Sequence, residues 1–161
     1  MIFNDPKGEI FSSTYPIMKK EGYNVVILNL RDTNRSSRWN PLTFIINEYV
    51  HCVKNNLDLS KVSEYIDTMA STLTNNPKSD PIWPSSAKSL LSALILYMIE
   101  QGYKHDKLDK VNMYSVYQFF IEYGQEVEET DPFGNVITKN RLDEIFKSLP
   151  VGSLAKAAYA T

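Results

Sequence analysis

Three charged residues lie close together near the N-terminus, in the segment Asp5-Pro6-Lys7-Gly8-Glu9. Carboxylate oxygens are the ligands that Mg²⁺ prefers, and metal-dependent nucleases combine them with a lysine. Such a site needs further carboxylates from other strands, and the rest of the sequence suggests none. A polar turn between a strand and a helix is therefore the better interpretation. The alternative interpretation is that the protein is a small metal-dependent nuclease that uses Asp5 and Glu9.

An ATP site would require a glycine-rich loop for the phosphates. The pattern G-x-x-x-x-G-K-[S/T] occurs nowhere in the sequence. The apolar run from Val25 to Leu30, followed by Arg31 and Asp32, imitates the strand that ends in a magnesium-binding aspartate in such ATPases. Polar residues follow any buried strand that leaves a sheet, so Arg31 and Asp32 are weak evidence for a magnesium site. Since the phosphate loop is also missing, the sequence predicts no ATP site and no cofactor in this chain.

Zinc chemistry and disulfides are not expected either. His51 and His105 are far apart and have no His, Cys or carboxylate beside them at the spacing of metal ligands. Cys52 is the single cysteine, so an internal disulfide is excluded. We expect Cys52 to be a small apolar residue on a helix.

A short basic segment follows Gly102 and contains Lys104, His105, Lys107 and Lys110. Such a segment is usually a solvated turn, but it is the best local candidate for contact with phosphate groups or with a partner. The tyrosines and phenylalanines from Tyr97 to Tyr123 have helical spacing, which favours core positions over a stacking platform for single-stranded bases.

The first forty residues have the pattern of a small α/β unit. Two short buried strands are predicted, at residues 2–3 and 24–30, with a crossover helix between them that ends at Gly22. Ser13 is the expected cap of this helix, which would place Pro16 in its first turn. A β-α-β unit needs neighbouring strands in a parallel sheet, so we expect the chain to be cut from a larger protein.

From Asn40 onward the apolar residues recur at steps of three and four, which indicates helices. The predicted helices cover residues 42–53, 58–73, 85–101, 111–123, 140–149 and 154–160. The third of these is apolar on most faces and is the expected central helix, with Gly102 as its stop. Residues 126–131 are predicted to be a loop, and residues 131–135 the tip of a small hairpin. The fold class is therefore mainly α, a helical bundle preceded by a short β-α-β piece.

The net charge of −2 and the pI near 5.7 provide no general cationic field, so any contact with DNA has to be local. The segment after Met1 does not have the pattern of a signal peptide. The longest apolar run, from Ala87 to Ile99, is shorter than the roughly 20 residues that a bilayer span needs. We expect a soluble fragment.

Several short motifs occur in a fixed order along the chain. They are Asp5-Pro6-Lys7-Gly8-Glu9, Gly22-Tyr23 with an apolar run, Trp39-Asn40-Pro41-Leu42, Asp80-Pro81-Ile82-Trp83 before Ala87 and Leu90-Leu91, and Leu149-Pro150 before Ser153 and Ala155. In this order and at this spacing they resemble the type IV coupling proteins of the TraG and TraD kind. The resemblance spans almost the whole chain.

The resemblance implies a hexameric ATPase, anchored in the inner (cytoplasmic) membrane, whose P-loop-type nucleotide-binding domain is interrupted by an all-helical domain. Residues 1–38 would be a β-α-β fragment of the nucleotide-binding domain. Residues 39–161 would be the all-alpha substrate-receptor domain, truncated at its C-terminus. Asp5, Lys7 and Glu9 match the family's turn near the nucleotide pocket, while ATP and Mg²⁺ would be bound by other parts of the parent protein.

The partners that the resemblance implies are the relaxase, the relaxosome accessory proteins, the transferred single-stranded DNA and the components of the secretion channel. The helical domain would receive them on the cytoplasmic side of the membrane. The slightly acidic composition favours protein partners with basic patches over DNA. Besides the nuclease, a helical interaction module unrelated to secretion is an alternative.

Overall fold

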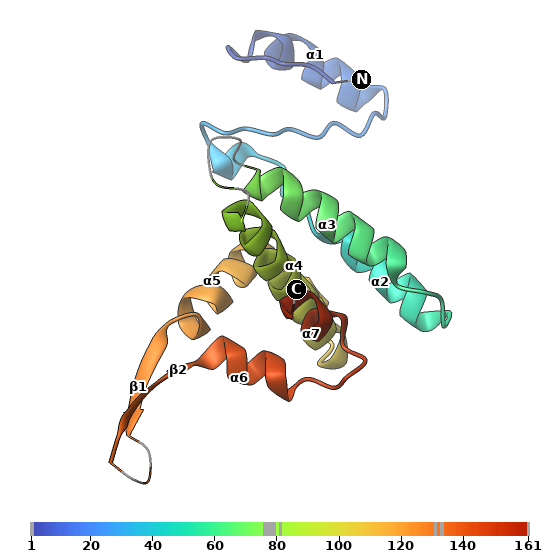
Figure 1. Cartoon of the computed structure of the whole chain (residues 1–161). Helices are drawn as coiled ribbons and strands as arrows, with labels where there is room; N and C mark the ends of the chain where they lie inside the picture. The colour runs from blue at the N-terminus through green and yellow to red at the C-terminus, as the bar shows by residue number, and fades with distance from the viewer. Residues whose placement is uncertain (1, 76–79, 81, 131, 133, 161) are drawn as a thin grey trace. The chain divides into compact units, whose positions relative to one another are not determined.

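The computed structural model describes residues 2–75, 80, 82–130, 132 and 134–160. The chain divides into two compact units, an N-terminal unit, Met1–Trp39, and a helical unit, Asn40–Thr161 (Figure 1). Helices are the main secondary structure of the described residues, so the predicted mainly α fold class is confirmed. Pro81, within the Asp80–Trp83 motif, lies outside the described residues.

The N-terminal unit contains the helix α1, Glu9–Lys20, and the 3-10 turn η1, Thr33–Arg35. α1 begins four residues before the predicted cap Ser13, because Gly8 occupies the N-cap position. Pro16 therefore lies inside the helix and not in its first turn, and that part of the prediction is wrong. A proline there cannot donate the usual backbone hydrogen bond.

Neither of the two strands predicted for this unit forms. The described residues at 2–3 and 24–30 are not assigned to strands, and the apolar side chains of Val26, Leu28 and Leu30 are 68–83% exposed. Ile27 instead pairs locally with Ser37, whose backbone N–H donates to the Ile27 carbonyl at 2.6 Å. A parallel strand forms only between neighbouring strands, and the described residues of this unit provide none.

The helical unit is built from six helices, one 3-10 turn and one hairpin in the part of the chain that the structure describes. In order they are α2 (Thr43–Lys54), α3 (Ser60–Thr74), α4 (Ile82–Lys104), η2 (Leu108–Lys110), α5 (Met113–Tyr123), β1 (Glu126–Thr130), β2 (Val136–Asn140), α6 (Arg141–Ser148) and α7 (Leu154–Tyr159). The two strands pair antiparallel, with Glu126 opposite Asn140 and Thr130 opposite Val136.

The helix α4 is the centre of this unit, as predicted. It packs against α3 and α7 most extensively and also contacts α2, α5 and η2. Its residues Ala93 to Leu96 and Ile99 are all buried, because apolar side chains occur on every face of this part of the helix. The core around them also includes Leu42, Val62, Ile66, Val111, Val116, Leu142 and Phe146.

Side chains accept hydrogen bonds from backbone N–H groups at the start of several helices. The carboxylate of Asp58 accepts from the backbone N–H and the hydroxyl of Ser60 at the start of α3, which lowers the pKa of Asp58. Asn140 accepts from the Leu142 N–H at 2.9 Å, and Ser153 accepts from the Lys156 N–H at 3.2 Å. Each cap satisfies a donor that the first helical turn leaves free.

Two other predictions for this unit need correction. Residues 126–130 form β1 and not a loop, because Val127 and the β2 residues opposite it complete a hairpin around the predicted turn. Residues 131 and 133 of that turn lie outside the described residues. Gly102 does not end α4, which continues to Lys104. A Cβ atom at Gly102 would lie 2.7 Å from Val111 Cγ2, so the glycine allows η2 and α4 to approach closely.

Candidate functional site

The turn of the first candidate site, Asp5 to Glu9, is held together by Asp5. Its carboxylate accepts from the backbone N–H of Gly8 at 3.0 Å and of Phe11 at 2.8 Å. Gly8 has a φ of 78°, in the left-handed region that favours glycine. Asp5 therefore fixes both the turn and the first turn of α1.

Lys7 and Glu9 are exposed on the same turn, and Glu9 is the first residue of α1. A negative side chain at this end of a helix is favourable because the helix dipole is positive there. No group of three or more His, Cys, Asp or Glu side chains with the arrangement of a metal site occurs in the described ranges. The geometry assigns Asp5 a structural task, and no contact on this turn favours the nuclease alternative.

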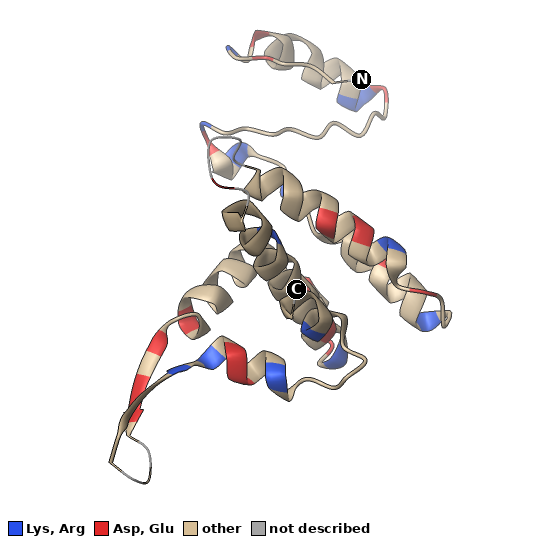
Figure 2. Cartoon of the chain, viewed as in Figure 1, with Lys and Arg blue, Asp and Glu red and all other residues tan. Residues whose placement is uncertain are grey.

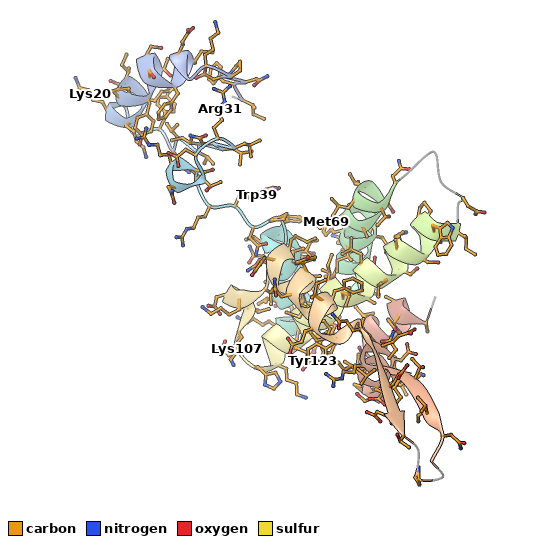
Figure 3. All side chains as sticks on the ribbon, turned by 90° about the vertical axis from the view of Figure 1, so that its left-hand side faces the viewer. Lys20, Arg31, Trp39, Met69, Lys107 and Tyr123 are labelled. Atoms are coloured by element: carbon orange, nitrogen blue, oxygen red, sulfur yellow. The ribbon has the colours of Figure 1, made fainter. Side chains whose placement is uncertain are left out.

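The second candidate site, the basic segment after α4, forms one tight turn. Asp106 is left-handed with a φ of 55°, and the Lys107 N–H donates to the Gly102 carbonyl at 2.7 Å. The left-handed residue and this hydrogen bond cap the C-terminus of α4, which is a common arrangement at helix ends. The side chains of Lys104, His105, Lys107 and Lys110 are all exposed around this turn, and Figure 3 shows Lys107 there.

The charge of this turn is small, because two carboxylates accompany the three lysines. Asp109 lies 2.9 Å from Lys110 Nζ, and the hydrogen bond from Lys110 lowers the pKa of Asp109. With Asp106 included, the turn from Lys104 to Lys110 has a net charge of +1 when His105 is neutral. A DNA-binding surface usually combines several unopposed cations, so this turn is a weak phosphate site.

The aromatic residues of α5 divide between the core and the surface. Phe119 stacks on Tyr97 with ring centroids 4.9 Å apart, and Tyr123 packs against Phe119 at 4.8 Å. Tyr114 and Tyr117, by contrast, are 70% and 57% exposed, and Ile121 is 43% exposed. The prediction of core positions is therefore right for Phe119 and Tyr123 and wrong for Tyr114, Tyr117 and Phe120. Periodicity alone does not distinguish the faces, since both carry aromatic residues.

The hairpin that follows α5 carries most of the local negative charge. Figure 2 shows acidic residues on β1 and at the end of α5, and Figure 1 shows the hairpin extending away from the helices of this unit. Residues 122–144 contain seven acidic and two basic residues, a net charge of −5. Lys139 pairs with Glu129 at 2.7 Å, which lowers the pKa of Glu129 and raises that of Lys139.

Two polar contacts link segments of the helical unit that lie far apart in the sequence. The side-chain amide of Asn40 donates to the Val111 carbonyl at 2.7 Å and accepts from the Leu42 N–H at 3.1 Å. This links the start of α2 to the segment before α5, which lies 71 residues further along the chain. Leu42 itself is fully buried.

The second contact joins α4 to α7 through Glu100. Its carboxylate accepts from the Ser153 hydroxyl at 2.8 Å, the Leu154 N–H at 2.9 Å and the Ala155 N–H at 3.3 Å. The α7 helix begins at these donors, so Glu100 caps a helix that lies more than fifty residues away in sequence. Sequence reasoning missed Glu100, because no local pattern connects it to Ser153.

A family model described as type IV secretory system conjugative DNA transfer matches residues 1–153. The chain belongs to this family. The match covers both units and confirms the resemblance to TraG/TraD-type coupling proteins that the ordered motifs predict. It also excludes the alternative of a helical module unrelated to secretion. Neither the comparison with curated proteins nor that with solved structures found a match.

Two of the coupling-protein motifs coincide with structural contacts of the helical unit. The motif that begins at Trp39 contains Asn40 and Leu42, and the motif that begins at Leu149 contains Ser153, which Glu100 binds. This family is a membrane-associated component of secretion. Among the described helices, α4 is long and apolar enough to cross a membrane, a criterion that the central helix of a packed bundle also meets.

Proposed function

We propose that the helical unit of this chain is the substrate-receiving part of a coupling protein. In this role it recruits the relaxase, the relaxosome accessory proteins and the transferred DNA to the secretion channel. The family match over both units carries the proposal, because it places the helical unit in a conjugative DNA transfer protein. The parent protein is expected to be a homo-hexameric ATPase anchored in the inner membrane, with this part in the cytoplasm.

We expect this chain itself to lack ATPase activity. The phosphate loop is missing from its sequence, and ATP and Mg²⁺ would be held by other parts of the parent protein. Asp5, Lys7 and Glu9 are expected near the nucleotide pocket only because of the family resemblance. Bringing substrate to the ATPase raises its effective concentration at the pore, and this is how a receptor without catalytic residues contributes to transfer.

The charge distribution favours protein over DNA as the direct ligand. The helical unit has fifteen acidic and eleven basic residues, a net charge of −4, whereas the N-terminal unit has a net charge of +2. The basic turn after α4 has a net charge of only +1. Non-specific DNA affinity depends on the number of phosphates that lysines and arginines neutralise, and this unit offers few unopposed cations.

The test is a set of titrations of the chain with the relaxase, with each accessory protein and with single-stranded DNA, at several salt concentrations. We expect saturable binding of at least one protein and weak binding of DNA. Tight DNA binding that falls steeply with salt, together with no protein binding, would contradict the proposal. The variant Lys104→Gln/Lys107→Gln/Lys110→Gln locates any DNA contact, because each lost phosphate contact reduces the salt slope by about 0.7.

A further inference from the structure

We propose that the outer face of α5 and the β1–β2 hairpin form the surface on which the helical unit binds a basic, amphipathic segment of a relaxosome protein. We define this α5–hairpin surface by Tyr114, Tyr117, Ile121, Glu126 and Glu128. The inference rests on the proposed function and identifies the recognition surface and the chemistry of its partner.

The apolar part of this surface is a stripe along α5. Tyr114, Tyr117 and Ile121 follow one another at steps of three and four, so they share one face of the helix. They extend over about 10 Å of the helix axis, which is enough for two or three apolar side chains of a partner helix. Phe120, 37% exposed, borders the stripe. Exposed tyrosines contribute much of the binding energy in protein interfaces.

The stripe is presented on a rigid support. On the opposite side of α5, Val116 is buried in the core, and Phe119 stacks on Tyr97 of α4. The N-terminus of α5 is closed by a capping box, in which Asn112 and Ser115 bind each other's backbone N–H groups. A surface that is already ordered loses little conformational entropy when a partner binds.

The hairpin gives this surface its preference for a basic partner. Glu126 and Glu128 lie on one face of the two-stranded sheet, opposite the uncharged Asn140 and Thr138. Their carboxylates make no hydrogen bond or ion pair with the other described residues. Glu129, on the opposite face, is already neutralised by Lys139. The two free carboxylates follow the apolar stripe within a few residues, so an apolar segment flanked by lysines or arginines complements both parts.

The same charges oppose single-stranded DNA as the occupant. Aromatic side chains stack on bases, but such platforms lie in positively charged grooves that follow the phosphate backbone. Here the residues beyond the stripe, 122–144, have a net charge of −5. Phosphates would be repelled where the stripe ends, whereas a cationic peptide segment would be attracted.

The test compares the binding of the relaxase and its accessory proteins to the wild-type chain and to three variants. Tyr114→Ser/Tyr117→Ser removes most of the apolar stripe, and Glu126→Gln/Glu128→Gln removes the free charges. Leu57→Ser/Glu64→Gln is the matched control, because it removes an exposed apolar and an exposed acidic side chain elsewhere on the helical unit. Since every substituted residue is exposed, circular dichroism and urea midpoints are expected to match the wild type.

We expect the tyrosine variant to weaken binding at least about tenfold, as the loss of hot-spot residues does. The glutamine variant is expected to weaken binding about two- to fivefold at low salt and to reduce its salt dependence. The control is expected to bind as the wild type does. Overlapping peptides of the partner are expected to place the binding segment where basic and apolar residues alternate.

Several results would overturn this inference. If the wild type binds a relaxosome protein and both surface variants bind it equally well, the proposed function stands and the α5–hairpin surface is wrong. If no relaxosome protein binds the wild type, both proposals fail. Single-stranded DNA binding that the tyrosine variant abolishes would make the stripe a base-stacking platform. Concentration-dependent dimerisation in sedimentation, lost in the same variant, would make it a contact between two copies of this chain.

Discussion

Replacing Glu100 with alanine is expected to detach α7 from the helical unit. The substitution removes the acceptor of three hydrogen bonds, from the Ser153 hydroxyl and from the N–H groups of Leu154 and Ala155. Hydrogen bonds to a charged group contribute about 1.5–3 kcal/mol each. Because Glu100 is half-buried, water replaces part of this contribution, and we expect a total loss of about 2–4 kcal/mol.

The conservative variant Glu100→Gln separates the charge from the hydrogen bonds. The glutamine oxygen still accepts from the two N–H groups. Its amide N–H donates to the Ser153 hydroxyl oxygen, which reverses the direction of the third hydrogen bond, and the negative charge at the N-terminus of α7 is lost. Such a charge is worth about 0.3–1 kcal/mol, so this variant is expected to cost about 1 kcal/mol or less.

The assay is urea unfolding of the whole chain, followed by circular dichroism. The transition reports the helical unit, because the N-terminal unit has no buried residue among those described. With a slope of about 2 kcal/mol per molar urea, the midpoint of the alanine variant is expected to fall by about 1–2 M. Glu64→Ala, exposed on α3, is the control and is expected to stay within about 0.5 kcal/mol of the wild type. An alanine variant at position 100 that unfolds with the wild type would refute this account of α7.

Three further predictions concern other contacts of the helical unit. Asn40→Ala removes the hydrogen bond to the Val111 carbonyl and the acceptor for the Leu42 N–H. Urea unfolding is expected to show that the free energy of unfolding falls by about 1–3 kcal/mol. An unchanged midpoint would contradict the link between the start of α2 and the segment before α5. Gly102→Ala places a Cβ atom 2.7 Å from Val111 Cγ2. The free energy of unfolding is expected to fall by about 1–3 kcal/mol, and the thermal midpoint by several degrees. An unchanged thermal midpoint would mean that η2 and Val111 lie further from α4. Tyr159 donates to Asp143 at 2.6 Å, and burial, followed by this bond, raises its pKa to about 12. Since the neutral phenol is the stabilised form, its contribution is present below pH 10 and is lost between pH 10 and 12. Tyr159→Phe is therefore expected to be about 1 kcal/mol less stable at pH 8 and to approach the wild type above pH 10; a difference that is independent of pH would contradict this.

The sequence predicts the helical unit well, because its helices depend on local patterns. The apolar steps of α2 to α5 can be read from residues a few positions apart. Glu100 could not be predicted, because its partner helix begins more than fifty residues later. The strand expected at residues 24–30 failed for a related reason. Strand formation depends on neighbouring strands, and a local apolar run does not show whether they are present.

The candidate sites were harder to predict than the fold. The basic segment after Gly102 is visible in the sequence, and its net charge of only +1 follows from Asp106 and Asp109 in the same segment. The structure adds that Asp109 pairs with Lys110 at 2.9 Å. The aromatic residues of α5 have the same spacing on both faces, so the exposed pair Tyr114 and Tyr117 could not be separated from Phe119 and Tyr123. Which face packs against α4 is a property of the tertiary structure.

Photo-crosslinking in conjugating donor cells tests the receptor role of the helical unit most directly. A photoreactive amino acid is placed at position 117 on α5, or at position 107 in the basic turn, of the protein that carries this chain. The account predicts that position 117 forms adducts with the relaxase or an accessory protein and that position 107 does not. Adducts between position 107 and the transferred DNA strand, with no protein adduct at position 117, would contradict it.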